Sequence, residues 1–459
     1  MKSFELTPSF ENIYDNFTRD TIGRDRDVWD FCRILDSIDG SYCIAIDGSW
    51  GCGKTFFIKQ AKMVLDTLNP NIEREELTEE KRKMIISDCN RFSRGEDVEL
   101  QPQVCVYYDA WRNDNDVDPI LSIVYSIVSE IECDFNFSSD KNKIFDIVSA
   151  IFECIKGINI KSIVESLEKH SILDAIQSEK ELERKIAEFF DSLLPEKGQR
   201  LVIFVDELDR CKPSYAIQIL ERIKHYFGND RITFVFSINA KELEHTISSY
   251  YGVDFDSGRY LDRFFDLRIA LPKPNIDYFF QSIDFSDTNR WYDIVCKAFI
   301  KTYNLSMREI ARYASSTKLV ESHFRSGIYH PSSTDYAMMT VLPIMIGLKI
   351  LNASLFDSFI NGNNSKPLID VAKNVPEGCF RFLLSQNEVY GKKTNDSQIE
   401  VQLVDRLNEY YHILFSPTLP PAKYGLIQVG SIEIESDTST LLKHAASGLE
   451  CFEDSKIKR

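Results

Sequence analysis

Short apolar runs alternate with longer segments of helical periodicity between residues 41 and 275 of the chain. Each run has the length of a buried strand and is rich in Val, Ile, Phe and Tyr. The runs stand at 42–46, 104–108, 200–207, 231–239 and, after a short helix, near the end of 260–272. Strands that alternate with helices form parallel sheets that helices cover on both faces. The pattern therefore predicts an α/β domain over residues 41–275.

Helical periodicity dominates the rest of the chain. Apolar positions in residues 1–40 are spaced for one helix face, which predicts a helical lead-in. The charged stretch 69–103 predicts a surface insertion. A helical pattern that begins at Pro119 predicts a helical insertion over about 112–200, between the second and third strands. Strand signals fade after residue 275, so we expect a C-terminal all-helical domain over 276–459.

The chain has no window of the roughly 18 uninterrupted apolar residues that a membrane-spanning helix needs. The nearest candidate, 144–160, is interrupted by charged residues and has the pattern of an amphipathic helix. The N-terminus has no apolar core of the kind that a signal peptide requires. We therefore expect no transmembrane segment, and peripheral membrane contact stays an open alternative.

Composition narrows the function classes. With 459 residues and 43% hydrophobic content, the chain is long enough for two or three subdomains with packed cores. A formal net charge of −17 argues against a chain-wide nucleic-acid surface. The 11 cysteines are scattered without any C-x-x-C pair, as in proteins that keep their thiols reduced. This usage predicts a cytoplasmic location.

The first apolar run leads into a phosphate-binding pattern. Residues 48–55 read GSWGCGKT and fit G-x-x-x-x-G-K-[ST] in the required strand-then-helix context. Glycines let consecutive N–H groups point at phosphate oxygens, and the helix predicted over Thr55–Leu68 adds its positive end. Lys54 would reach the β- and γ-phosphates, and the Thr55 hydroxyl would bind Mg²⁺. The alternative is a glycine-rich turn before an ordinary helix.

The expected nucleotide-binding residues are Gly48, Ser49, Trp50, Gly51, Cys52, Gly53, Lys54, Thr55 and Phe56. Cys52 lies at a helix N-terminus, where the pKa of a thiol falls, so a redox role is one hypothesis for it. A filling role is the favoured interpretation. The lead-in helix of residues 1–40 would pack beside the adenine, or would pack without touching a ligand.

The third apolar run ends in two carboxylates, as a Walker B strand does. Asp206 at the strand tip would hold Mg²⁺ through water, next to Thr55. Glu207 directly follows it and is placed to orient and deprotonate the attacking water. The alternative is a buried strand that leaves the core at an acidic turn. The phosphate-binding pattern upstream favours the catalytic interpretation.

A polar residue follows the fourth run. Asn239 would lie beside the γ-phosphate in a sheet that carries its ligand at the carboxyl ends of the strands, which makes it a candidate sensor. Asn is also a favoured N-cap, and a helix is predicted from Ala240. The two roles are compatible, and the sequence does not choose between them.

Several segments together resemble the KAP family of P-loop NTPases, on the STAND/ASCE side of that fold. The string VDELDRC at 205–211 is similar to the family signature. The segments GSWGCGKT, YYDAWRND, YLDRFFDLRIALPKP and LSMREIARY also match, in the family's order. The resemblance covers about residues 20–315. It implies a sheet of order 5-1-4-3-2, with the loop, the metal, the catalytic carboxylate and the sensor around one Mg-ATP.

Individual roles follow from the resemblance by position. It implies that Glu207 is the general base, although many members carry Asp there. It implies an arginine finger at Arg263 and a sensor-2 arginine at Arg308, either of which would act across a subunit interface. A surface salt bridge is the alternative for each arginine. For Asp209 and Arg210, a salt bridge that fixes the turn is the favoured role.

Many family members carry transmembrane helices between the two Walker segments, whereas the insertion here lacks the apolar length. The chain therefore resembles the soluble bacterial members, some of which are associated with phage exclusion. We expect Mg²⁺-dependent ATP hydrolysis coupled to conformational change or assembly, in anti-phage defence, with a homo-oligomer or a partner protein bound through helical regions. The rival hypothesis is a nucleotide-gated scaffold with little turnover that recruits partners. The acidic balance disfavours a nucleic-acid motor, and the choice between ATP and GTP stays open.

Overall fold

The computed structural model describes residues 7–93, 99–116, 118–134, 150–151, 181–182, 184–190, 194, 198–226, 228, 230–282, 291–324, 333–376, 379–383, 396–415, 426–430 and 432–447. The chain forms two compact units, one over Thr7–Tyr278 and the other built mainly from Phe279–Arg459. The first unit contains the predicted α/β region. The domain limits predicted at residues 40 and 275 stay predictions.

A five-stranded sheet is the centre of the first unit. Its strands are β1 (Tyr42–Asp47), β2 (Gln103–Asp109), β3 (Arg200–Asp206), β4 (Ile232–Ile238) and β5 (Leu267–Ala270). Every neighbouring pair is parallel. The order β2-β3-β4-β1-β5 is the predicted order read from the other edge, so the α/β prediction is confirmed. Because all strands run the same way, their carboxyl ends meet along one edge, where such sheets carry their ligands.

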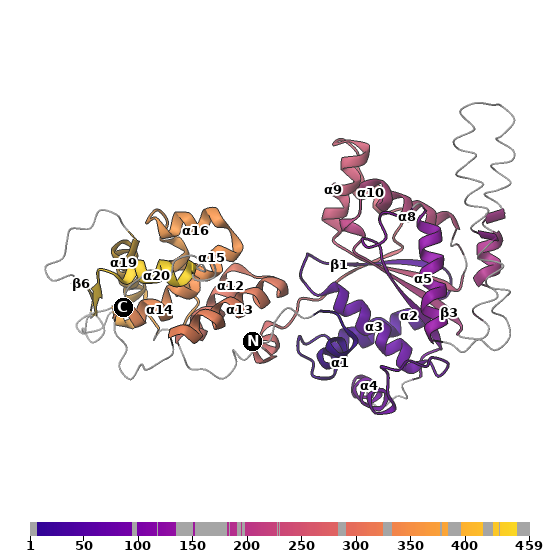
Figure 1. Cartoon of the computed structure of the whole chain (residues 1–459), viewed down its shortest axis with the longest axis horizontal. Coiled ribbons are helices and arrows are strands. Elements are labelled where there is room, and N and C mark those ends of the chain that lie inside the picture. The colour runs from indigo at the N-terminus through magenta and orange to yellow at the C-terminus, as the bar shows by residue number, and fades with distance from the viewer. Residues whose placement is uncertain are drawn as a thin grey trace. The chain divides into compact units, whose positions relative to one another are not determined.

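Alternate side chains of each strand enter two separate cores. Ile44, Val202 and Val235 face one core, whereas Val106 and Ile203 face the other. The first core is covered by α1 (Phe10–Thr18), α2 (Asp25–Ser37), α3 (Lys54–Leu68) and α4 (Glu79–Phe92). The second is covered by α5 (Pro119–Asp134), α8 (Pro213–Tyr226), α9 (Ala240–Tyr251) and α10 (Ser257–Leu261). Figure 1 shows these helices on opposite sides of the strands, as the near-continuous apolar strands require.

Two helices on the first face differ from the sequence prediction. Helix α3 begins at Lys54, one residue earlier than expected, because Gly53 supplies the left-handed residue before it. Helix α4 is capped by the Thr78 side chain and packs on α1, α2 and α3. It buries Ile85 and Cys89 completely, so the charged stretch predicted as a surface insertion contributes to the core.

Helix α5 opens the predicted helical insertion. Within that insertion the structure also describes a helical piece at 184–190, whose Phe189 and Phe190 are buried against the second core. The amphipathic helix predicted at 144–160 lies outside the described residues, apart from 150–151.

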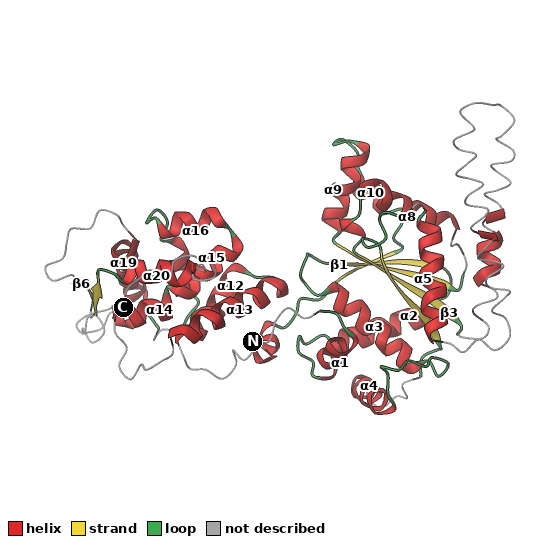
Figure 2. Cartoon of the chain, viewed as in Figure 1, coloured by secondary structure: helices red, strands yellow, loops and turns green. Residues whose placement is uncertain are grey.

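The described residues of the second unit form helices and one hairpin (Figure 2). Helix α11 (Ile276–Ser282) spans the limit between the units. The helices that follow are α12 (Trp291–Tyr303), α13 (Met307–Phe324), α14 (Ser333–Thr340), α15 (Leu342–Leu351), α16 (Ala353–Ile360), α17 (Lys366–Ala372), α19 (Asp396–Phe415) and α20 (Thr438–Ser447). The predicted helical character is present, but the sequence did not identify the antiparallel pair β6 (Leu426–Val429) and β7 (Ile432–Glu435).

One described stretch, Thr334–Leu351, is long and apolar enough to cross a membrane by length and composition alone. In the structure it breaks between α14 and α15, and 61% of it is buried inside the protein. All residues of α15 from 342 to 348 are buried, and the helix packs against α12, α13 and α16. A helix of this kind is typical of the centre of a helical core.

Candidate functional site

The phosphate loop curls between β1 and α3. Gly51 and Gly53 adopt left-handed conformations with φ of 76° and 94°, which only glycine takes without a steric cost. The Lys54 ammonium lies inside the curve and donates to the carbonyl oxygens of Gly48 at 2.7 Å and Ser49 at 3.3 Å. A lysine inside a glycine-rich loop, at a helix N-terminus, is an arrangement that binds phosphate groups.

A buried arginine from the lead-in supports this loop. Arg24 precedes α2 and is only 1% exposed. Its guanidinium donates to the carbonyl oxygen of Cys52 at 2.7 Å and to that of Pro272 after β5. Through Arg24, the loop backbone is therefore connected both to the start of α2 and to the segment that directly follows β5. Sequence reasoning did not identify this contact, because 28 positions separate Arg24 from Cys52.

The phosphate loop and the acidic strand tip meet. Thr55 Oγ1 donates to Asp206 Oδ2 at 2.7 Å, although 151 positions separate the two residues in the chain. Asp206 is 1% exposed and is the last residue of β3. In the sheet register it stands between Asp109 of β2 and Ser237 of β4. The two residues predicted to bind the metal therefore lie in direct contact.

This pair has the chemistry that a magnesium site needs. Mg²⁺ takes oxygen ligands and is usually held by one or two carboxylates together with water and substrate phosphates. Thr55, the residue after the phosphate-loop lysine, supplies a hydroxyl, and Asp206 supplies a carboxylate. Both lie at the edge of the sheet where the strands end. The residues present fit the ion: Thr55 would be a direct ligand, and Asp206 would accept a hydrogen bond from a metal-bound water.

The proposed general base occupies a strained turn. Glu207 has a φ of 60°, which is uncommon for a residue with a side chain, and its N–H donates to Asp206 Oδ1 at 3.0 Å. Burial, and then the charge of Asp206, raise the pKa of Glu207 to about 7. The Glu207 carboxylate also pairs with Arg210 Nε at 2.6 Å. The turn therefore holds a carboxyl group close to the strand tip in one defined conformation.

Arg210 forms a salt bridge in this turn, whereas Asp209 is held by a hydrogen bond. Arg210 pairs with Glu207, while Asp209 accepts a hydrogen bond from Trp50 Nε1 at 2.6 Å. Burial raises the pKa of Asp209 above its ordinary value. The Arg210 guanidinium also lies 5.5 Å from the ring centre of Trp111, in the loop after β2. The phosphate loop and the Walker B turn are thus joined by Trp50 as well as by Thr55.

The remaining predicted residues differ in how they relate to this site. Asn239 follows β4 and its side chain accepts from the N–H of Glu242 at 3.4 Å, so it caps α9. Its role as a sensor stays a prediction. Arg263 is exposed in the turn between α10 and β5. Arg308 lies in α13 of the other unit. The roles predicted for both arginines stay predictions.

Besides Arg24, sequence reasoning missed Tyr107. The Tyr107 hydroxyl donates to Asp206 Oδ2 at 3.0 Å, the same oxygen that accepts from Thr55. The available signal was its position in YYDAWRND, near the end of the strand that pairs with β3. The predicted sheet order places β2 beside β3, but it does not give their register, in which Tyr107 lies opposite Phe204 and within reach of Asp206.

Comparison with known proteins agrees with this geometry. Residues 31–316 match the model of the KAP family P-loop domain, which covers more than half of the chain. A search of curated proteins gives no match. The match begins within α2 and ends within α13, so it includes the whole sheet, the phosphate loop and the Walker B turn.

Proposed function

The chain belongs to the KAP family of P-loop NTPases, and from this membership we propose that it binds ATP with Mg²⁺ and hydrolyses it. We further propose that the nucleotide state is coupled to a conformational change or to assembly. The observation that carries the proposal is the 2.7 Å contact between Thr55 and Asp206. It joins the phosphate-binding helix to the acidic strand tip, as one Mg-nucleotide site requires.

Each side chain has a defined task in this proposal. Lys54 binds oxygens of the β- and γ-phosphates, and Thr55 and Asp206 hold the metal. Bound Mg²⁺ would stabilise the negative charge that develops on the phosphate oxygens. Glu207 orients a water molecule toward the γ-phosphorus and accepts its proton, while the bond to the β–γ bridging oxygen breaks and ADP leaves. Catalysis by positioning and electrostatics needs no covalent intermediate.

The direct test is phosphate release by the purified chain with ATP and Mg²⁺, compared with its Glu207→Gln variant. Loss of the general base is expected to lower turnover about 100-fold or more, while nucleotide affinity stays within a few-fold of the wild type. Glu80→Gln, which changes an exposed glutamate of α4, is the matched control and should keep wild-type turnover.

A nucleotide-gated scaffold is the second candidate function. The 2.6 Å pair between Glu207 and Arg210 favours it, because a carboxylate engaged by a guanidinium is a poorer base for water. In this case the wild type would release phosphate at the background rate and Glu207→Gln would match it, while ATP binding persisted. That result would overturn the enzymatic proposal and leave nucleotide binding intact.

We propose defence against phages as the biological setting, in a cytoplasmic protein that forms a homo-oligomer or recruits a partner protein. The support is the similarity to soluble bacterial family members and the free thiols of the described cysteines. Efficiency of plating tests the setting. Cells that express the wild type should show fewer plaques than cells that express Lys54→Ala, and equal plaque counts would reject the proposal.

A further inference from the structure

Tyr107 links the Walker B carboxylate to a buried ionic cluster. Resting on the proposed magnesium-nucleotide function, we propose that Tyr107 is a positioning residue that holds Asp206 in the orientation needed for the metal. Tyr107 itself touches neither the metal nor the nucleotide in this proposal. It acts through Asp206, and its removal should change how much Mg²⁺ contributes to nucleotide binding.

The first step of the argument is the set of donors around Asp206. Its Oδ2 accepts from Tyr107 at 3.0 Å and from Thr55 at 2.7 Å, and its Oδ1 accepts from the N–H of Glu207 at 3.0 Å. A metal would bind Thr55 through an oxygen lone pair, which leaves its O–H free to donate to Asp206. Tyr107 is the other side-chain donor to Asp206 Oδ2 among the described contacts, and two donors fix the carboxylate plane better than one.

The second step is that Tyr107 is itself held from three sides. Its backbone N–H donates to Glu130 Oε2 of α5 at 2.8 Å. Among the described residues, strand β2 forms one edge of the sheet, so this bond satisfies a strand N–H that no described strand accepts on that side. The Lys59 ammonium of α3 lies 4.1 Å from the centre of the Tyr107 ring. The backbone of Tyr107 therefore contacts Glu130, its ring contacts Lys59, and its hydroxyl contacts Asp206.

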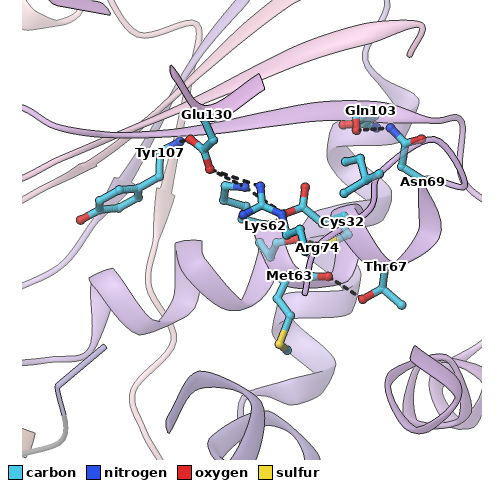
Figure 3. A network of polar contacts seen from close by, with 12 residues as sticks. Cys32, Lys62, Met63, Thr67, Asn69, Arg74, Gln103, Tyr107 and Glu130 are labelled. Carbon is cyan, nitrogen blue, oxygen red and sulfur yellow. Dashed lines mark hydrogen bonds and ion pairs between the residues drawn. The ribbon is translucent and has the colours of Figure 1, made fainter. Parts of the chain in front are cut away.

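The third step is the cluster that holds Glu130, drawn in Figure 3. Glu130 Oε1 lies 2.8 Å from Lys62 Nζ and 3.3 Å from Arg74 Nη2. Lys62 also lies 2.8 Å from Asp66, which pairs with Arg74 at 3.2 Å. Because Lys62 and Asp66 belong to α3, the same helix that carries Thr55 positions Glu130, and through it Tyr107. The phosphate-binding helix therefore fixes both donors to Asp206 Oδ2.

The fourth step is the chemistry of the donor. A tyrosine hydroxyl has an ordinary pKa of about 10, so it is protonated at pH 7 and can donate to Asp206 Oδ2, which lies 3.0 Å away. A neutral phenol orients a carboxylate without neutralising it. A lysine or arginine in the same place would compete with the metal for the negative charge. The residue type thus suits orientation of a metal-binding carboxylate.

The experiment measures equilibrium binding of a fluorescent ADP analogue to the full chain, with Mg²⁺ titrated and with Mg²⁺ removed by EDTA. Tyr107→Phe deletes one hydroxyl and keeps the ring and the backbone bond to Glu130. We expect the Mg²⁺ concentration for half-maximal enhancement of binding to rise about 10-fold or more, as for other groups that orient metal-binding side chains. Affinity in EDTA should stay at the wild-type value.

Tyr108→Phe is the matched control. Tyr108 is the next residue of β2 and faces the opposite core, where its hydroxyl contacts Ser122 at 3.0 Å and Tyr215 at 2.7 Å. Its loss removes buried hydrogen bonds of β2 without touching Asp206. We expect it to lower the melting temperature by a few degrees and to leave the Mg²⁺ titration unchanged.

Two results would overturn the inference. One is a Tyr107→Phe variant with the wild-type Mg²⁺ titration, and the other is an equal shift in Tyr108→Phe, which would show a general effect of weakening β2. If the wild type itself bound the analogue without any dependence on Mg²⁺, the proposed function would fail together with the inference. A Mg²⁺-dependent wild type beside an unaffected Tyr107→Phe would reject the inference alone.

Discussion

Among the residues near the proposed nucleotide site, Gly53 and Glu207 have left-handed backbone conformations for different reasons. Gly53, with a φ of 94°, lets the phosphate loop turn into α3. Glu207, with a φ of 60°, turns the chain away from β3 while its N–H bonds to Asp206. Non-glycine residues in such conformations cost about 1–3 kcal/mol and concentrate at functional sites. The surrounding contacts of the strand tip offset this cost at Glu207.

Gly53→Ala should therefore damage the phosphate loop. The left-handed backbone at this position is unfavourable for any residue with a Cβ. The added Cβ would also lie 3.2 Å from Arg24 Nη1, which supports the loop. We expect nucleotide affinity to fall at least about 10-fold, equal to about 1.4 kcal/mol. Gly228→Ala, where the added Cβ meets nothing within 4 Å, should bind like the wild type. Equal affinities for all three proteins, measured by fluorescence titration, would show that the loop accepts a side chain.

At the residue scale, the sequence predicted the groups that a local motif dictates and missed those that depend on contacts between distant segments. Lys54 and Thr55 follow from the glycine spacing, and Asp206 follows from the end of an apolar run. Tyr107 and Arg24 reach the site only because the sheet and the lead-in bring distant segments together. The motif could suggest that Arg210 forms an ion pair, but not that its partner is Glu207.

Among the elements, α5 is joined to the phosphate-binding helix α3 by the ionic cluster around Glu130. Burial alone would raise the pKa of Glu130, but the Lys62 ammonium beside it holds that pKa below its ordinary value. For Lys62, burial favours a lower pKa, and Asp66 and then Glu130 raise it above the ordinary value. The lowered pKa of Glu130 and the raised pKa of Lys62 are consistent, since each charge stabilises the ionised form of its partner.

Glu130→Gln should destabilise the first unit because it removes one of the two carboxylates that pair with the buried ammonium group of Lys62. The expected loss is about 3–5 kcal/mol at pH 7, measured by urea unfolding. Since the folded pKa lies below the unfolded value of about 4.3, ionised Glu130 stabilises the fold above that pH. This stabilisation disappears as the pH falls through the folded pKa, so wild type and variant should converge in acid.

Glu181→Gln is the control for this prediction. Glu181 pairs with Arg184 at 3.1 Å, and the two side chains are 52% and 62% exposed. Exposed pairs contribute little, so its loss should change stability by less than about 1 kcal/mol at either pH. If Glu130→Gln were equally mild at pH 7, the cluster would not hold α5 against α3.

Element prediction succeeded where periodicity was strong and failed where the signal was short. The parallel strands predicted from the pattern were correct, and so was the sheet order that the family resemblance implied. The hairpin β6–β7 was missed because each strand has only four residues, although Ile432 and Ile434 alternate with exposed glutamates in a strand pattern. The contribution of α4 to the core was not predicted, because its many charged residues mask the pattern of its buried apolar positions, Ile85 and Cys89.

For the whole molecule, the second unit depends on close helix packing that can be tested separately. Gly347 of α15 leaves no space for a Cβ, because the Phe299 ring of α12 occupies that position. Gly347→Ala should cost about 1–3 kcal/mol through overpacking. Calorimetry should show a lower melting temperature for the second unit, with nucleotide binding by the first unit unchanged. A variant with the wild-type melting temperature would show that the core accommodates the methyl group.

The proposed assembly is also a property of the whole molecule. Arg263 is exposed between α10 and β5, as a finger that acts on a neighbouring subunit must be. We expect the wild type to form a larger species with a non-hydrolysable ATP analogue than without it, as measured by light scattering. Arg263→Ala should assemble similarly but turn over about 1,000-fold more slowly. A monomer under both conditions, with full Arg263→Ala activity, would exclude a finger in trans.

The most direct test of the account is a titration of the purified chain with a fluorescent ATP analogue, with and without Mg²⁺, beside Lys54→Ala and Asp206→Asn. We predict binding below about 1 mM that strengthens with Mg²⁺ in the wild type. The lysine variant should lose most affinity, and the aspartate variant should lose the Mg²⁺ enhancement. Absence of wild-type binding at millimolar nucleotide, or identical curves for all three proteins, would contradict a single magnesium-nucleotide site formed by Lys54, Thr55 and Asp206.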